Sequence, residues 1–473
     1  MLFAPPQGAC VGIDAVSALW SQCADGALGP QALRRLTLQG EEPALPSSFA
    51  VATAAQAAIA AAALAASEIG RQRNGLLQGV SVDLRGAVAE CSAWFSIDGR
   101  VPDAWDKVSG LYRCADGWVR VHANFAHHRN GALQLLGLPP GPDTPRSALQ
   151  AVLSRRAALA VEEAAARAGL VIAALRSFDE WDAHPQAHAL ATQPLIDFQR
   201  IGDAPPLQLP PLPLEAQPLA GVRVLELTRI LAGPVGGRTL AAHGADVMLV
   251  NSPRLPNIEH IIDTSRGKLS CHADLHTAAG RDALADLVRG AHVFVQGYRP
   301  GGLAALGFGP EHTAALRPGI VHVSLSAYGP GGPWRQRRGF DSLVQTATGF
   351  NDAEMRAAGS DVPKPLPVQI LDYATGFLIA FAAQAALMRQ QREGGSWHVQ
   401  LSLARTAAWL RSLGRIEGGF VARAPAVEDH AETLASGWGE LRAVRHAGQL
   451  QHTPTRWPRP SVPPGTHAPR WPD

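Results

Sequence analysis

Short apolar runs alternate with longer helical patterns through the second half of the chain. The apolar runs predict strands at residues 222–227, 246–250, 292–295 and 320–325, and the segments between them predict helices at 235–244 and 281–289. Short runs separated by helices are typical of a parallel sheet that is covered on both faces. No GxGxxG motif follows any of these runs, so the pattern does not indicate a dinucleotide cofactor. The pattern therefore predicts an α/β fold built on a Rossmann-like parallel sheet.

A region with a different pattern of apolar and polar residues precedes this predicted sheet. Residues 110–121 alternate around an Asp-Gly pair, which predicts a β-hairpin, and residues 148–168 are helical by composition. Together they predict a smaller α+β domain over residues 96–204. The Pro-rich stretch that follows favours an extended connector. We therefore interpret residues 205–218 as a linker and 219–420 as the large domain.

The sequence also contains an internal repeat. Residues 49–84 parallel residues 373–403, because each segment has a long Ala-rich helical pattern, an Arg-rich turn and a short apolar run. The first copy has no Asp or Glu between residues 43 and 67, and so has no counterpart of Asp372 in the second. We interpret residues 1–95 as a degenerate half-copy that carries no chemistry.

Residues 50–66 are apolar enough to be compared with a membrane span. Alanine dominates them, Thr53 and Gln56 interrupt them, and they are shorter than a typical span, so a buried helix and no membrane partner are predicted. Residues 421–473, which end in a stretch rich in Pro, Trp and Arg, are predicted to form an extended tail.

Composition excludes several classes of function. The 42 basic and 40 acidic residues leave a formal net charge of +2 without a basic stripe, so no nucleic-acid partner is expected. The five cysteines are scattered and form no CxxC pair, which argues against a disulfide framework and for a reducing compartment. The first residues do not have the pattern of a signal peptide. A cytoplasmic location is therefore expected.

Asp372 is the best candidate for a catalytic residue. It follows the apolar run 368–371, which is predicted to be a strand, and it precedes a long apolar helical pattern that opens at Tyr373. A carboxylate between the end of a strand and the start of a helix lies where the active sites of open α/β proteins are usually found. The alternative interpretation is a simple helix cap.

Four motifs in the second half carry a resemblance to a known family. They are a strand and tight turn at 219–234, the run Ser265-Arg266-Gly267-Lys268, the loop Gly297-Tyr298-Arg299-Pro300, and the Gly-Pro turns that lead to Gly339-Phe340-Asp341. In this order they resemble the family III CoA-transferases, the formyl-CoA and carnitine CoA-transferase group. The smaller domain precedes the large one here, so the domain order looks rearranged relative to that family.

The resemblance implies a site as well as a fold. It implies that Asp372 is the nucleophile, that an acyl-CoA and a carboxylic acid are the substrates, that no metal takes part, and that two subunits interlock as a homodimer. Arg266 and Lys268 would pair with CoA phosphates, and free N–H groups at a helix start would suit a phosphate or an oxyanion. The CoA contacts implied in this way are Arg229, Ile230, Leu231, Ala232, Arg254, Arg266, Lys268, Ala273, Gly297, Tyr298 and Arg299.

Two other functions stay open. Related α-methylacyl-CoA racemases have a histidine acid/base at the position of Phe340, and phenylalanine cannot move a proton, which weighs against a racemase or isomerase. Asp341 is interpreted as the cap of a helix at 342–348. The half-copy and the rearranged order leave a non-catalytic CoA-binding homologue as the second alternative. The acyl donor and acceptor are not identified by the sequence.

Overall fold

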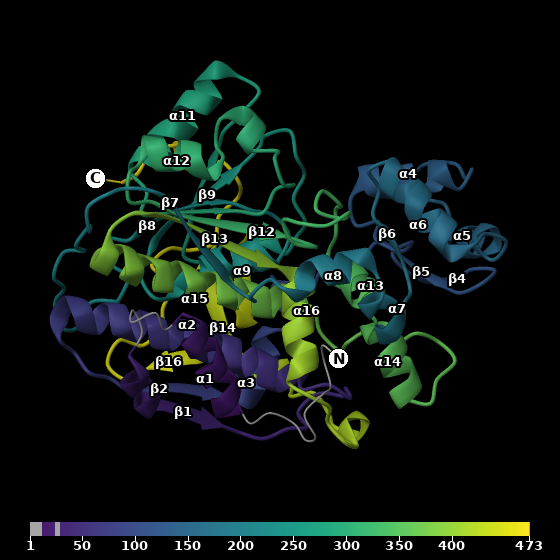
Figure 1. The fold of residues 1–473 in the computed structure, drawn as a ribbon, viewed down its shortest axis with the longest axis horizontal. Helices are drawn as coiled ribbons and strands as arrows, with labels where there is room; N and C mark the ends of the chain where they lie inside the picture. The colour runs from purple at the N-terminus through teal and green to yellow at the C-terminus, as the bar shows by residue number, and fades with distance from the viewer. Residues whose placement is uncertain (1–11, 24–28, 473) are drawn as a thin grey trace.

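A seven-stranded sheet lies at the centre of the computed structural model, which describes residues 12–23 and 29–472 (Figure 1). Neighbouring strands are parallel except for β7, which pairs antiparallel with β13 at one edge. The N-terminal residues on which the signal-peptide expectation rests lie outside the described part. The strand order is β10 (Leu269–His272), β9 (Asp246–Asn251), β8 (Arg223–Leu227), β11 (Val293–Gln296), β12 (Val321–Ser326), β13 (Ser396–Ser402) and β7 (Asp197–Gly202).

Helices cover both faces of this sheet, as the apolar runs predict. On one face α9 (Ala232–Ala242) and α15 (Ile370–Glu393) pack on the strands, and on the other lie α11 (Ala278–Arg289) and α12 (Pro310–Leu316) (Figure 1). Adjacent residues of each strand face different layers; within β8, for example, Val224 and Leu225 belong to separate core clusters. The predicted α/β fold with a parallel sheet is therefore confirmed.

The two copies of the repeat form a pair of central helices. In α2 (Val51–Asn74) and α15, the apolar segments are long enough to cross a membrane by length and composition, and both are wholly buried inside the protein. The two helices pack against each other. The prediction of a buried helix at residues 50–66 is confirmed.

The smaller α+β region lies beside the sheet (Figure 1). The predicted hairpin is present as β4 (Gly110–Arg113) and β5 (Trp118–Val121), and β6 (Ile172–Ala174) extends it. The helical character predicted for residues 148–168 is confirmed, and the segment forms two helices. The Asp116 carboxylate in the hairpin turn accepts a hydrogen bond from the Ala158 N–H at 2.8 Å, which caps the second of them. The helices of this region are α4 (Ala126–Leu135), α5 (Arg146–Leu153) and α6 (Ala158–Arg167).

The C-terminal segment differs from the expected tail over residues 431–450, whereas residues 451–472 form no helix or strand, as predicted. Residues 431–450 form strands, because their apolar side chains complete sheets begun by distant strands: Leu441 is fully buried, and Leu450 nearly so. One such sheet is β1 (Leu36–Gln39), β2 (Val80–Asp83) and β16 (Gly448–Leu450); the other is β14 (Ala431–Ser436), β15 (Gly439–Val444) and β3 (Phe95–Ile97).

The predicted linker forms no helix or strand and packs along the ends of the central helices. Arg73 of α2 donates to the Pro210 carbonyl at 2.8 Å, and Gln390 of α15 donates to the Pro205 carbonyl at 3.0 Å. The remaining α-helices are α1 (Gly12–Gln22), α3 (Leu84–Glu90), α7 (Phe178–Asp182), α8 (Pro185–Ala191), α10 (Ile261–Thr264), α13 (Asp341–Ala347), α14 (Phe350–Ala357) and α16 (Leu403–Ser412).

Candidate active site

Asp372 is the third residue of α15 and does not end a strand. The strand predicted at 368–371 is wrong, since Ile370 and Leu371 already belong to the helix and the residues before them are irregular. A short apolar run has the same appearance whether it is a strand or the start of a buried helix. The carboxyl group is therefore held in the first turn of a helix, where negative charge is favoured by the helix dipole.

Asp341 holds the backbone of Asp372 in place. Its Oδ2 accepts a hydrogen bond from the Asp372 N–H at 2.9 Å, and its Oδ1 accepts one from Gln345 Nε2. Asp341 is the first residue of α13, after the cap position at Phe340, so the prediction that its side chain caps its own helix is wrong. It caps α15 instead.

Burial raises the pKa of both carboxyl groups. Burial raises the pKa of Asp341 to about 7, against the opposing effect of its hydrogen bonds. Burial, and then the charge of Asp341, raise the pKa of Asp372 well above its ordinary value. Among the described residues, none forms a hydrogen bond or ion pair with the Asp372 carboxylate. The Asp372 carboxyl group is thus buried, has no partner among the described residues, and loses its proton at a higher pH than an ordinary aspartate does.

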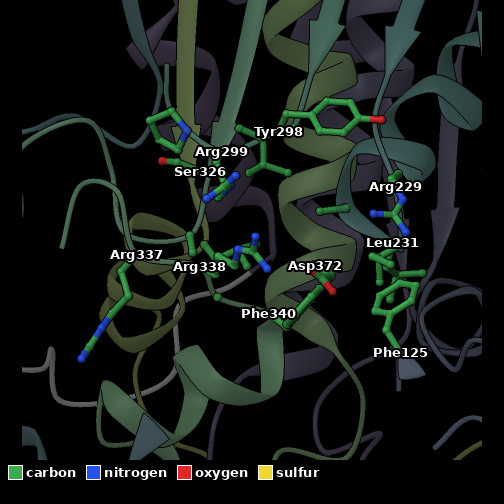
Figure 2. A pocket seen from close by; sticks show the side chains of 18 of the residues that line it. Phe125, Arg229, Leu231, Tyr298, Arg299, Ser326, Arg337, Arg338, Phe340 and Asp372 are labelled. Carbon is green, nitrogen blue, oxygen red and sulfur yellow. The ribbon is translucent and has the colours of Figure 1, made fainter. Parts of the chain in front are cut away.

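Asp372 lines a cavity of about 320 Å³ at the carboxyl ends of the parallel strands (Figure 2). Its walls come from the loops after β8, β11 and β12, from the segment before α13 and from the start of α4 in the smaller region. The predicted residues brought together here are Asp372, Arg229, Ile230, Leu231, Ala232, Gly297, Tyr298 and Arg299.

The loop after β8 has a strained backbone. Ile230 has φ of 75°, in the left-handed region that a β-branched residue rarely adopts. Such strain persists where the surrounding structure enforces it and is often found at functional sites. Two residues further on, α9 packs closely on α15, since a Cβ on Gly376 would lie 2.6 Å from the Ala232 carbonyl oxygen. The strained loop therefore leads directly into a close contact with the helix that carries Asp372.

Arg266 and Lys268 do not reach the cavity, contrary to the prediction. Both are almost wholly buried, and they precede β10, so they lie at the amino end of a parallel strand and not at the carboxyl end where the cavity opens. Lys268 Nζ pairs with Glu226 at 2.7 Å. Arg266 pairs with Asp263 at 2.6 Å and with Glu432 at 3.2 Å. The structure therefore gives both residues partners within the protein in place of phosphates.

Arg254 and Ala273 lie at the carboxyl edge of the sheet but outside the cavity wall. Arg254 follows β9 and pairs with Asp274 at 2.8 Å, with most of its side chain exposed, and Ala273 follows β10. The neighbouring Leu255 does line the cavity. Contact of Arg254 and Ala273 with CoA stays a prediction.

The smaller region contributes cavity residues that were not predicted from the sequence. Phe125, His127 and His128 line the cavity, and His122 stacks on Phe340 with ring centroids 4.0 Å apart. Burial, with a neighbouring histidine second, lowers the pKa of His122 and of His128 to about 3, so both rings are neutral near pH 7. His122, His127 and His128, which follow the hairpin closely in the sequence, could have indicated that this region contributes to the site.

Arg337 and Arg338 were also missed. Both belong to the cavity-lining segment that leads to Phe340. They lie in the Gly-Pro-rich motif, in which only Phe340 and Asp341 were assigned roles from the sequence. Two adjacent arginines close to a candidate nucleophile were a usable signal for anion binding.

The second half of the chain is similar to one family of known proteins. Residues 219–428 match the model of CoA-transferase family III. The chain is 34% identical over 211 residues to a succinate–glutarate CoA-transferase of Agrobacterium fabrum, covering 41% of this chain and 52% of that one. It is 32% identical over 211 residues to a probable fatty acyl-CoA transferase of Mycobacterium tuberculosis, covering 42% and 53%. A crystal structure of that mycobacterial protein aligns over 42% of this chain and 56% of its own with a TM-score of 0.40. The chain spans about half the length of these relatives.

Proposed function

Because residues 219–428 match the model of CoA-transferase family III, we propose that this protein moves CoA from an acyl-CoA thioester to a carboxylic acid, with Asp372 as the nucleophile. The observation that carries the proposal is the state of the Asp372 carboxylate, which faces a 320 Å³ cavity and has no partner among the described residues. The adjacent carboxylate, Asp341, is occupied by hydrogen bonds and cannot take this role.

The chemistry proceeds through two kinds of covalent intermediate. An Asp372 oxygen attacks the thioester carbonyl and the C–S bond breaks. This step forms a mixed anhydride of the acyl group with Asp372 and releases CoA as a thiolate. The thiolate then attacks the aspartyl carbonyl, which releases the donor acid and leaves an aspartyl-CoA thioester. The acceptor carboxylate attacks this thioester and expels the thiolate, which finally attacks the acceptor acyl carbon. The new thioester leaves and Asp372 regains its carboxylate.

Stabilisation of the oxyanion is assigned to the start of α9. The Asp372 N–H already donates to Asp341, so it is not available for this purpose. Among the described residues, the N–H groups of Leu231 and Ala232 have no hydrogen-bond acceptor, and both residues line the cavity. Preorganised N–H donors at a helix start are suited to a developing negative charge.

A racemase function receives less support. Phe340 lies in the cavity wall and carries no titratable proton. Burial lowers the pKa of His122 and of His128 to about 3, which makes both rings weak bases, and His122 is stacked face to face on Phe340. An acyl-CoA substrate incubated in deuterated water is expected to gain no deuterium at C2.

The cytoplasmic location and the interlocked homodimer are part of the proposal. Cys91, Cys114 and Cys271 are buried thiols that form no disulfide, in keeping with a reducing compartment. Light scattering after size-exclusion chromatography tests the dimer, for which the expected mass is twice that of the chain.

Exchange of labelled CoA tests the activity. The protein is incubated with a radiolabelled acyl-CoA and a panel of unlabelled acids, and new labelled thioesters are separated by chromatography. Transfer to at least one acid is expected with the native chain and none with Asp372→Asn. Tight CoA binding without transfer to any acid would favour the non-catalytic homologue.

A further inference from the structure

A buried ion pair lies next to the loop that follows β8. Lys268 Nζ donates to Glu226 Oε2 at 2.7 Å, and both side chains are fully buried. Neither residue lines the cavity, so the pair does not reach a substrate bound there. Burial raises the pKa of Glu226 and lowers that of Lys268, so each charge depends on the other. Replacing a buried ion pair by apolar residues often leaves stability unchanged or higher, so stability alone does not explain this pair.

The ion pair holds both ends of that loop. At the first end, Thr228 Oγ1 donates to Glu226 Oε1 at 2.6 Å. At the second end, Lys268 Nζ donates to the Pro234 carbonyl at 2.8 Å. Between these anchors lies the strained backbone of Ile230, with φ of 75°. The ion pair therefore fixes the two ends of the strained loop relative to each other.

Two glycines let the start of α9 rest directly on these groups. A Cβ on Gly237 would lie 1.8 Å from Glu226 Oε2, and a Cβ on Gly233 would lie 2.4 Å from Thr228 Cβ. No side chain fits between the first turns of α9 and the groups they touch. The position of the helix start is therefore set by contact with the Glu226 carboxylate and the Thr228 side chain.

The start of α9 also contacts the helix that carries the nucleophile. A Cβ on Gly376 would lie 2.6 Å from the Ala232 carbonyl oxygen, and Gly376 is about one helical turn after Asp372 in α15. Leu231 lines the same cavity as Asp372 (Figure 2). A shift of the helix start would therefore move its N–H groups relative to Asp372.

We infer that Lys268 and Glu226 are positioning residues, which hold the loop so that the N–H groups of Leu231 and Ala232 stabilise the oxyanion formed at Asp372. This rests on the proposed function. Such donors are effective only when their position is fixed before the reaction. Loss of the ion pair would let the strained backbone relax and displace them. The ion pair thus acts on the reaction through the loop and without touching the substrate.

Removal of one anchor tests the inference through the separate values of kcat and KM. Thr228→Val removes the hydroxyl bond to the ion pair and keeps the shape, so kcat of the CoA exchange should fall about 10-fold, the low end for a lost hydrogen bond to a charged group. The KM for the acyl-CoA should not change. Thr228→Ser keeps the hydroxyl and should recover most of the rate. The control is Thr239→Val, which removes a buried bond from the same helix to the Val235 carbonyl at 2.8 Å and should keep the native kcat.

Removal of the ion pair should have a larger effect. Lys268→Met should lower kcat roughly 100-fold, as when an oxyanion donor is lost, while CoA affinity measured by calorimetry stays the same. It also leaves the Glu226 carboxylate buried and unpaired, which costs stability. Adding Glu226→Gln to this variant removes that charge, so the double variant should unfold at a higher urea concentration than Lys268→Met while its kcat stays low.

Three results would overturn the inference. The first is a native kcat in Thr228→Val, which also decides the matter if Lys268→Met does not fold. The second is a raised KM for the acyl-CoA with an unchanged kcat in Lys268→Met, which would assign the ammonium group to a CoA phosphate. The third is a kcat that recovers together with stability in the double variant, which would make the ion pair purely structural.

Deuterium uptake at the start of α9 distinguishes these failures from failure of the proposed function. The Val235 N–H donates to the Leu231 carbonyl at 2.8 Å and reports on the first turn. Its exchange should be faster in Thr228→Val than in the native chain and unchanged in Thr239→Val. Faster uptake in a chain that transfers CoA to no acid would contradict the transferase and keep the anchored loop. Native kcat with unchanged uptake in Thr228→Val would do the reverse.

Discussion

The two central helices, α2 and α15, start with nearly the same backbone conformation but differ in the side chain at their third residue. The residue before each helix has nearly the same conformation, with φ and ψ of −75° and 56° at Ala50 and −78° and 61° at Gln369. The third residue is Thr53 in α2 and Asp372 in α15. In both helices its N–H donates to a distant carboxylate, that of Glu42 at 2.8 Å or Asp341 at 2.9 Å.

The side chains at this third position separate the two sites. The Thr53 hydroxyl donates to the same Glu42 oxygen at 3.1 Å, so every polar group there has a partner. The Asp372 carboxylate has none among the described residues and faces a cavity. The repeat therefore supplies the same anchored helix start twice, and reactivity follows from a carboxylate that is left unpaired beside open space.

Removal of that carboxylate is expected to have the largest effect. Asp372→Asn keeps the size and the N–H anchor but cannot form the anhydride, so exchange should fall by at least about 1,000-fold. CoA binding, measured by calorimetry, should persist. Native exchange rates in this variant would show that another group reacts.

Removal of the neighbouring charge is expected to shift the pH dependence. Ionised Asp372 is the reactive form, so exchange rises with pH as that carboxyl loses its proton. Burial and then Asp341 raise its pKa, and Asp341→Asn removes the second cause while its amide oxygen still accepts the Asp372 N–H. The acid limb of kcat/KM should move to lower pH. An unmoved limb would contradict the coupling of the two groups.

Placing a carboxylate in the other copy is expected to cost stability without adding chemistry. Thr53→Asp loses the hydroxyl bond and sets a second acid against Glu42 in a buried place, at about 2–3 kcal/mol of unfolding free energy. Urea unfolding measures the loss. Thr53→Ser, which keeps a hydroxyl, is the matched control and should stay close to the native value.

The smallest expected effects concern helix packing. Gly376 meets the Ala232 carbonyl, whereas Ala57 occupies the same position of α2. Gly376→Ala should cost about 1–3 kcal/mol through overpacking and reduce exchange by displacing the loop at Ala232. Ala57→Gly should cost only about 1 kcal/mol through helix propensity. If the two variants lost the same unfolding free energy and kept the same exchange activity, the proposed packing difference between α2 and α15 would be wrong.

The sequence predicts the sheet well because a parallel sheet buries each strand as a short apolar run. It also locates Asp372, whose position after an apolar run holds even though that run is helical. Local patterns do not predict ion pairs between residues that are far apart in the sequence. Lys268 pairs with Glu226, and Arg266 pairs with Glu432 of the C-terminal segment, only in the folded chain. Two of the strands at 431–450 were missed for the same reason, since β15 pairs with β3 and β16 with β2, hundreds of residues away. The local hairpin of β14 and β15 was missed as well.

Covalent capture of the intermediate tests the central claim most directly. The native chain is incubated with an acyl-CoA, reduced with borohydride, digested and analysed by mass spectrometry. An aspartyl-CoA thioester at position 372 would be reduced to homoserine there, and the same treatment without acyl-CoA would leave aspartate. Exchange activity with unmodified aspartate at 372, or with the modification at another carboxylate, would contradict the account.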